Sequence, residues 1–260
     1  MLFTNNIDPI LVSFAGLQIH WYGVFFALGI IFCYLFLIKG FEKHGYPVEH
    51  VDSLAIYLFL GLLIGARLGQ VFFYEPGYFL ENPSEIVKVW HGGLSSHGAT
   101  IGLFISYIAW AKVHKIKFAK YVDLIVVPIP IAAACVRIGN FFNSEIIGNP
   151  TRGNYGVIFK KLGETFPRHP AQLYEAALCL ATFGVTYFLY KKYYGKLPQL
   201  FILSAFLLVY FGGRFVLEYF KDLHGPLPTD FPLSMGQVLS ILPALAAVGY
   251  FVWLAVRKRK

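Results

Sequence analysis

Seven long apolar stretches restrict the possible folds more than any other feature of this sequence. Hydrophobic residues make up 57% of the 260 positions and charged residues only 14%, whereas soluble domains carry about 25% charged residues. A helix needs about 20 apolar residues to cross a bilayer. We therefore expect an all-α integral membrane protein, with one polytopic domain over residues 1–260. The stretches lie near 20–38, 52–74, 94–111, 122–142, 172–190, 198–218 and 236–256.

Lysine and arginine are distributed unevenly between the segments outside these stretches. Thirteen of the 22 follow the first, third, fifth and seventh stretches, and six lie in the alternate loops. Cytoplasmic loops of membrane proteins carry an excess of Lys and Arg. The pattern therefore predicts seven spans, with the N-terminus outside and the C-terminus in the cytoplasm. The same bias accounts for the net charge of +8, so we expect no nucleic-acid partner.

The remaining three basic residues, Arg67, Arg137 and Arg214, lie within the apolar stretches. A charged residue at the centre of a spanning helix costs about 2.5–3.5 kcal/mol on insertion scales. Arginine binds phosphate or carboxylate with a bidentate fork, so three arginines predict a polar cavity for an anionic group. The alternative is purely structural pairing, with Glu145 neutralising Arg137 and Glu218 lying one turn after Arg214.

Histidines and a tyrosine adjoin the predicted outer ends of the stretches. His97 falls in the first turn of the third stretch, where the positive end of the helix disfavours imidazolium. A neutral imidazole can accept a proton, although a structural hydrogen bond would also explain this histidine. His169 stands between Arg168 and Pro170, and Tyr22 is either an interfacial anchor or a ligand-binding residue.

Several common functional motifs are missing from the sequence. It contains no phosphate-binding G-x-x-x-x-G-K-[ST] motif, no H-E-x-x-H and no paired cysteines with metal-binding spacing. Residues 236–256 contain no lysine, which excludes a retinal Schiff-base receptor. The three cysteines all lie in apolar runs, so a disulfide framework is not expected. We expect neither a metal nor another cofactor.

Several motifs that follow one another along the chain resemble the bacterial prolipoprotein diacylglyceryl transferase family. The resemblance covers nearly the whole chain, and the predicted seven-span topology matches it as well. One departure is Val136, where the family usually has glycine before the signature arginine. The motifs are HWYG (20–23), GARLG (65–69), GGLSSHG (92–98), RIGNFFNSEIIG (137–148), RHPAQLYE (168–175), GGRFVLEYF (212–220) and SMGQ (234–237).

The resemblance implies a reaction and a location. The diacylglyceryl group of phosphatidylglycerol would pass to the lipobox cysteine thiol of a preprolipoprotein signal peptide, forming a thioether and releasing glycerol phosphate. The enzyme would lie in the bacterial cytoplasmic (inner) membrane among its lipids, with the active site toward the outer leaflet. A thiol of pKa about 8.5 must be deprotonated to react, and intramembrane arginines would stabilise the charge on the departing phosphate.

The resemblance also implies roles for individual residues. Arg137 would hold the lipid phosphate, Arg214 would share that site, and His97 is the candidate base, although Arg137 or a substrate-assisted route could serve instead. An arginine-lined transporter or channel and a non-catalytic lipid-binding scaffold are the rival interpretations. The expected substrate-binding residues are Arg137, Tyr22, Arg67, Asn140, Asn143, Glu145, Gly148, His169 and Glu218, the last also positioning Arg214.

Overall fold

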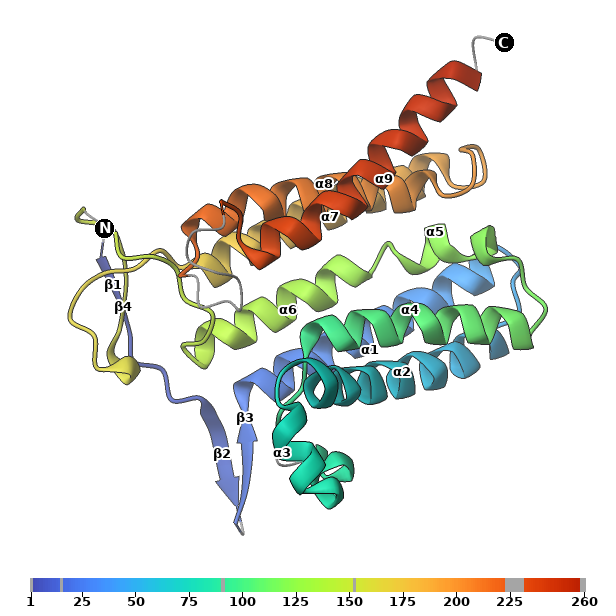
Figure 1. Cartoon of the computed structure of the whole chain (residues 1–260). Coiled ribbons are helices and arrows are strands. Elements are labelled where there is room, and N and C mark those ends of the chain that lie inside the picture. The colour runs from blue at the N-terminus through green and yellow to red at the C-terminus, as the bar shows by residue number, and fades with distance from the viewer. Residues whose placement is uncertain (1, 15, 90–91, 152, 223–231, 258–260) are drawn as a thin grey trace. The chain divides into compact units, whose positions relative to one another are not determined.

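Helices form most of the chain in the computed structural model, which describes residues 2–14, 16–89, 92–151, 153–222 and 232–257, except the side chains of residues 96 and 97 (Figure 1). The chain divides into two compact units. The first unit contains Met1–Phe36 and Tyr121–Lys260, and the second contains Leu37–Lys120. The sequence-based expectation of one domain remains a prediction.

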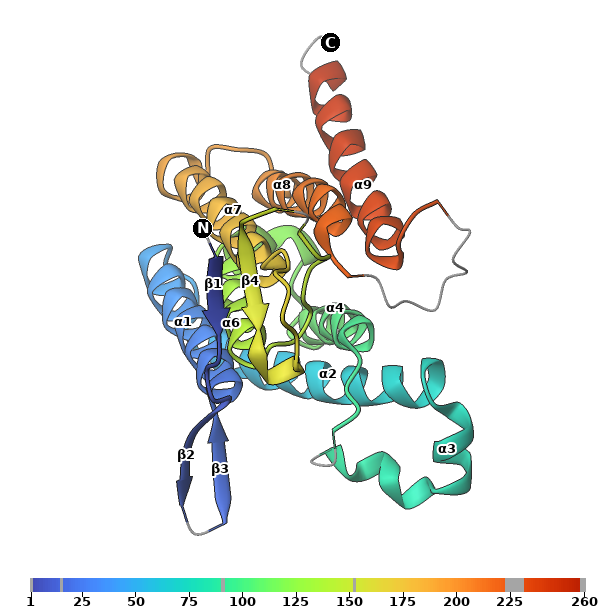
Figure 2. The same cartoon turned by 90° about the vertical axis from the view of Figure 1, so that its left-hand side faces the viewer.

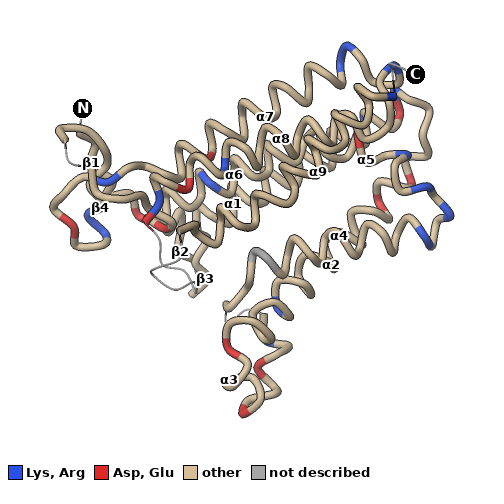
Figure 3. The backbone as a smooth tube through the Cα atoms, turned by 45° about the horizontal axis from the view of Figure 1, so that its top comes forward, with Lys and Arg blue, Asp and Glu red and all other residues tan. Residues whose placement is uncertain are grey.

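Each of the seven apolar stretches contains a helix, which confirms the predicted all-α membrane fold. Among the described residues, six helical segments are long and apolar enough to cross a membrane, and one shorter apolar helix accompanies them. The shorter helix is α4 (Ser96–Val113). Charged residues lie mostly toward helix ends and in loops, with few along the helices (Figure 3). The number of crossings and the orientation of the termini remain predictions.

The first unit is built around three successive helix contacts. Helix α6 packs on α7, α7 on α8, and α8 on α9, and Figure 2 shows α7 and α8 running side by side. The first part of α1 also belongs to this unit. The bounds are α1 (Trp21–Lys43), α5 (Val122–Ile125), α6 (Ile129–Phe142), α7 (Ala171–Tyr193), α8 (Phe201–Leu217) and α9 (Met235–Arg257), with short 3₁₀ helices η4 (Lys160–Leu162) and η5 (Glu218–Phe220).

The fourth predicted stretch is interrupted rather than continuous. Helix α5 ends at Ile125 and α6 begins only at Ile129, because Pro128 and Pro130 lack the N–H groups that a continuing helix needs. The short helix α5 has a second role. The Asp123 carboxylate accepts hydrogen bonds from the backbone N–H groups of Leu200 (2.7 Å) and Leu203 (2.9 Å). It therefore caps the start of α8 from a distant part of the chain.

Two small sheets were not anticipated from the sequence. Strand β1 (Leu2–Asn5) pairs in parallel with β4 (Gly156–Phe159), and β2 (Ile10–Phe14) forms an antiparallel hairpin with β3 (Leu17–His20). Each strand has only four or five residues, and such short runs give little periodicity to read. The β1–β4 pair brings the start of the chain beside the long loop that follows α6 (Figure 2).

The second unit depends on close packing between α2 and α4. Helix α2 (Glu49–Phe73) carries Gly61, Gly65 and Gly69 at four-residue spacing, and they face Gly98 and Gly102 of α4. A Cβ atom on Gly65 would lie 2.7 Å from the Cα of Gly102. Small residues at this spacing let helix backbones approach closely in membranes. The unit also contains α3 (Pro76–Glu81), η1 (Pro83–Val87), α4 (Ser96–Val113) and η3 (Phe118–Lys120).

The glycine contact predicts a clear stability effect. Gly65→Ala should lower the free energy of unfolding by about 1–3 kcal/mol, because the added methyl group forces two backbones apart. Gly184→Ala is the matched control, since a Cβ there would meet nothing within 4 Å and alanine favours helix. Thermal unfolding of the purified proteins in detergent measures both. Equal stability of the two variants would contradict the proposed packing.

Candidate active site

A buried carboxylate on α7 lies at the centre of a cluster of ion pairs in the first unit. Glu175 is only 3% exposed. Its Oε2 atom lies 3.0 Å from Nε of Arg137, and its Oε1 atom lies 3.4 Å from Nζ of Lys221 and 3.7 Å from Nη1 of Arg214. One carboxylate therefore holds cations from α6, from α8 and from the segment after η5. Neither Glu175 nor Lys221 is among the site residues predicted from the sequence, although the motif RHPAQLYE ends on Glu175.

The last turn of α6 connects this charge cluster to a row of amides. Nη1 of Arg137 donates to Oδ1 of Asn140 at 3.4 Å. Nδ2 of Asn140 donates to one carboxylate oxygen of Glu145, and Nδ2 of Asn143 donates to the other, each at 3.3 Å. Glu145 is therefore held by two amides, and its carboxylate is not the partner of Arg137 that the structural alternative required. Arg137, Asn140, Asn143 and Glu145 therefore form one network around the end of α6.

The turn after α6 has an unusual backbone. Ser144 and Ile146 have positive φ angles of 57° and 53°, a region that residues other than glycine enter rarely and β-branched residues least of all. The fully buried Gln172 of α7 donates to the carbonyl oxygen of Glu145 at 2.6 Å. This bond helps to hold the strained turn against α7, and backbone strain of this kind often occurs at functional sites.

Gly148 lies where three segments of the chain meet. Its N–H donates to the carbonyl oxygen of His169 at 3.0 Å. A Cβ atom added at Gly148 would lie 2.6 Å from both the His169 Cβ and the Phe220 carbonyl oxygen. Only glycine allows this approach. The structure therefore gives Gly148 a packing role, and a substrate contact remains a proposal.

The loop around Gly148 is also fixed by ion pairs. Arg168 lies 2.6 Å from Glu164 and 2.7 Å from Asp222, and it donates to the Gly148 carbonyl oxygen at 3.2 Å. Hydrogen bonding to Glu164, reinforced by Asp222, raises the pKa of the Arg168 guanidinium. The neighbouring His169 ring contacts the hydroxyl of Tyr174 through Nδ1 at 3.2 Å. His169 is thus part of the wall of this loop, and its binding role remains untested.

Tyr22 lies in the first turn of α1, directly against α6. A Cβ atom on Gly139 would lie 2.9 Å from the Tyr22 ring and 3.1 Å from its Cα. The Tyr22 hydroxyl also interacts electrostatically with Glu145 and Arg137. The structure therefore places Tyr22 against α6, where Gly139 leaves room for the ring, and its binding role remains a prediction.

Glu218 does not pair directly with Arg214 as the one-turn spacing suggested. Among the described residues, the ion pair of Arg214 within 4 Å is with Glu175, whereas Glu218 Oε2 lies 3.3 Å from Nζ of Lys221. The reason is that α8 ends at Leu217 and Glu218 begins the tighter helix η5. Tyr210, one helical turn before Arg214, also interacts electrostatically with the guanidinium. Glu218 is linked to the cluster through Lys221.

Arg67 and His97 belong to the second unit. Arg67 is 5% exposed, and its five N–H donors contact the backbone carbonyl oxygens of residues 85, 86, 88, 92 and 93. Its charge is therefore used to hold the loop between α2 and α4. The backbone of His97 lies in the first turn of α4, as predicted, and its side chain is outside the described part of the structure.

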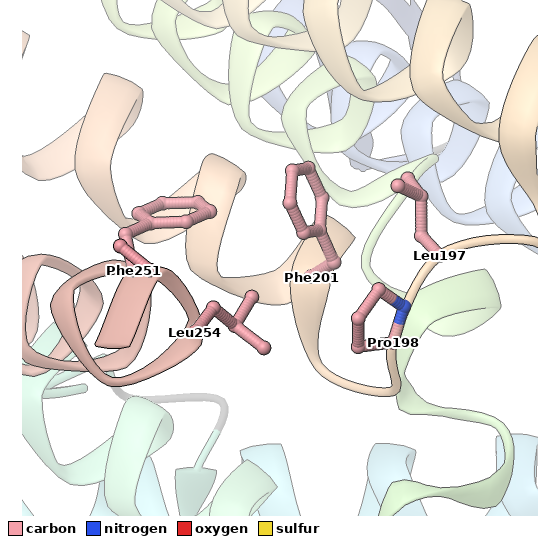
Figure 4. Close-up of a pocket in the computed structure, with 6 residues that line it drawn as sticks. Leu197, Pro198, Phe201, Phe251 and Leu254 are labelled. Atoms are coloured by element: carbon pink, nitrogen blue, oxygen red, sulfur yellow. The ribbon is translucent and has the colours of Figure 1, made fainter. Parts of the chain in front are cut away.

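An apolar hollow of about 280 Å³ (Figure 4) is lined by residues at the start of α8 and the end of α9, the ends opposite to this cluster. It is not a candidate active site, because none of its lining residues carries a charge or a reactive group. Within the described residues, no cluster of three or more His, Cys, Asp or Glu side chains could hold a metal ion. The hollow is lined by Leu197, Pro198, Phe201, Phe251, Leu254 and Ala255.

Comparisons with known proteins point to one family. Residues 9–253 match the family described as prolipoprotein diacylglyceryl transferase. A relative from Tolumonas auensis, named phosphatidylglycerol–prolipoprotein diacylglyceryl transferase, is 38% identical over the full length of both chains. A relative of the same name from Chloroherpeton thalassium is 41% identical over 94% of this chain and 91% of its own. Another relative of that name, from Dechloromonas aromatica, is 36% identical over 100% of this chain and 99% of its own.

The Glu175 cluster makes a prediction about stability. Glu175→Gln should lower the free energy of unfolding by about 3–5 kcal/mol, because it leaves buried cations without their shared carboxylate. Thermal unfolding in detergent measures the loss. Glu81→Gln is a suitable control, since Glu81 is exposed. A Glu175→Gln protein as stable as this control would show that the carboxylate does not hold the cluster together.

Proposed function

The chain belongs to the prolipoprotein diacylglyceryl transferase family, and from this membership we propose that it transfers the diacylglyceryl group of phosphatidylglycerol to a prolipoprotein. This reaction is the first step of lipoprotein maturation. The acceptor we propose is the thiol of the lipobox cysteine in the signal peptide. The two substrates are therefore an anionic membrane lipid and a membrane-inserted peptide, and both can reach an enzyme that is itself embedded in the membrane.

The proposed phosphate site rests on a difference between Arg67 and Arg137 in how many guanidinium donors are already used. A guanidinium has five N–H donors. In Arg67 all five donate to backbone carbonyl oxygens of the neighbouring loop. Among the described residues, the guanidinium of Arg137 forms an ion pair only with Glu175 and a hydrogen bond only with Asn140. The remaining donors of Arg137 can bind a phosphate bidentately. We assign Arg137 and Arg214 to the phosphate of phosphatidylglycerol, and Arg67 to the scaffold.

The chemistry of the transfer explains why cations are needed. The cysteine sulfur forms a bond to the glyceryl carbon while the bond from that carbon to the phosphate oxygen breaks. The electron pair of the broken bond stays on the departing glycerol phosphate, so negative charge grows there in the transition state. Arginines already fixed by Glu175 stabilise this charge without reorganising, and such preorganised electrostatic stabilisation is usually the largest catalytic contribution.

The neighbouring residues supply the rest of the proposed binding site. Asn140 and Asn143 hold Glu145 and offer amide groups toward the lipid headgroup, and Tyr22 lines the approach of the diacylglyceryl group. Gly148 and His169 belong to the loop between α6 and α7, which we propose forms one wall of the binding site. Glu218 acts through Lys221, the third cation of the cluster. We propose that His97 takes the proton of the attacking thiol.

The distribution of basic residues supports an orientation for the enzyme in the membrane. We propose that the enzyme lies in the cytoplasmic (inner) membrane of a bacterium, with the Glu175 cluster toward the outer leaflet. The cluster forms where α6 ends, α7 begins and α8 ends. The loops at that end carry few of the chain's Lys and Arg residues, which is typical of the non-cytoplasmic side.

Arginine substitutions test the phosphate site. With phosphatidylglycerol and a lipobox peptide as substrates, Arg137→Ala should abolish detectable transfer while membrane insertion is retained. Arg137→Lys should also be poor, because an ammonium group cannot form a bidentate fork. Release of glycerol phosphate and the mass of the peptide report the reaction. Wild-type turnover by the purified Arg137→Ala protein would rule out this assignment.

Histidine substitution tests the proposed base. His97→Gln should slow transfer by about 10²–10⁴-fold, the usual effect of losing a general base, with little change in lipid KM. Raising the pH should partly restore the variant, because more of the peptide thiol then ionises without help. Rate profiles against pH for both proteins provide the measurement. Parallel profiles combined with a raised lipid KM would show that His97 only binds lipid.

A further inference from the structure

We infer that the start of α9 is a positioning device for the active site, in which Gly236 seats the carboxylate of Glu218. This inference rests on the proposed function, because it assigns a further role within the same site. It concerns the SMGQ motif at residues 234–237, which is not among the residues proposed to bind phosphate. Gly236 is a positioning residue here, and it does not touch the substrate.

The contact between Gly236 and Glu218 is very close. A Cβ atom built on Gly236 would lie 2.6 Å from Oε2 of Glu218 and closer still to its Oε1 and Cδ atoms. The carboxylate therefore rests directly on the backbone of α9, in the space that any other side chain would fill. Glu218 itself is 5% exposed, so this contact with α9 is buried.

The backbone conformation of Gly236 does not require glycine. Gly236 is absent from the positions with positive φ, and it lies in a regular first turn, where alanine would be favoured by propensity. The close approach of the Glu218 carboxylate is the feature that excludes a side chain. This distinguishes Gly236 from Gly249 in the same helix, where an added Cβ would meet nothing within 4 Å.

The start of α9 is fixed by its own hydrogen bonds. Ser234 Oγ accepts from the Gln237 N–H at 3.1 Å, and Gln237 Oε1 accepts from the Ser234 N–H at 2.9 Å, which together form a capping box. Gln237 Nε2 also donates to the carbonyl oxygen of Phe215 in α8 at 3.4 Å. The motif therefore holds the helix start rigidly beside Glu218, and the partial positive charge there favours a carboxylate.

The seated carboxylate determines where a cation of the site lies. Lys221 Nζ is 3.3 Å from Glu218 Oε2 and 3.4 Å from Glu175 Oε1, so it is held between two carboxylates. If Glu218 moves, Lys221 loses one of these partners, and the charge that faces the lipid phosphate is rearranged. Misplacement of a group in the active site by about 1 Å can lower the rate about 100-fold. A single methyl group on α9 that displaces Glu218 should therefore slow the transfer.

The experiment adds that methyl group and then makes room for it. Gly236→Ala should lower kcat for transfer from phosphatidylglycerol to a lipobox peptide by roughly 10- to 100-fold. The clashing atoms are the end of a flexible side chain, so the protein should still fold. Shortening that side chain should relieve the clash, and the double variant Gly236→Ala/Glu218→Asp should turn over faster than Gly236→Ala alone. Gly249→Ala should behave as the wild type.

A second readout does not depend on catalysis. Thermal unfolding of the wild type, both single variants and the double variant forms a double-mutant cycle. Gly236→Ala should destabilise the Glu218→Asp protein less than it destabilises the wild type. If Gly236→Ala cannot be purified in folded form, recovery of a folded double variant supports the same contact, and failure of both variants to fold overturns it.

The outcomes separate this inference from the proposed function. A wild-type protein that transfers no diacylglyceryl group would disprove the proposed function, while the unfolding cycle would still test the contact. Three results would overturn the inference itself. These are wild-type kcat in Gly236→Ala, a double variant no faster than Gly236→Ala, and additive effects of the two substitutions on unfolding.

Discussion

The candidate active site depends on the attraction between one buried carboxylate, Glu175, and the cations that surround it. Taking charges out of water costs several kcal/mol per ion, and this cost is recovered only when opposite charges are closely paired. Arg137, Arg214 and Lys221 come from different parts of the chain, and Glu175 is the group that all three contact. The carboxylate therefore allows a group of like charges to exist at one place inside an apolar protein.

This arrangement has a consequence for catalysis. A carboxylate shared by three cations cannot use all of their donors, so the guanidinium groups of Arg137 and Arg214 keep capacity for a further anion. Arg67 shows the opposite case, since its donors are fully used by backbone carbonyl oxygens. The arginine that holds the scaffold and the arginines proposed to bind phosphate therefore differ in the number of donors left for a ligand.

Close backbone approaches at glycine give the site its shape. Gly139 makes room for Tyr22, Gly148 lets three segments meet, and Gly236 leaves space for the Glu218 carboxylate. In each case the neighbouring atom occupies the volume of a missing Cβ. In the second unit the same principle operates between helices, where glycines of α2 face glycines of α4. Glycine thus serves both the scaffold and the site.

The sequence by itself determined the membrane-embedded helical fold, the positions of its apolar helices and the family. These properties depend on composition, on segment length and on local motifs, which can be read along the chain. It also singled out Arg137, Asn140, Asn143 and Glu145 as candidate site residues, because polar residues in or beside an apolar helix are costly and therefore conspicuous. Tertiary structure alone decided which charges meet. Glu175 and Lys221 look like ordinary helix and loop residues until folding brings them together, and the partner of Arg214 is Glu175 rather than its sequence neighbour Glu218, because pairing energy depends on distance in space and on burial.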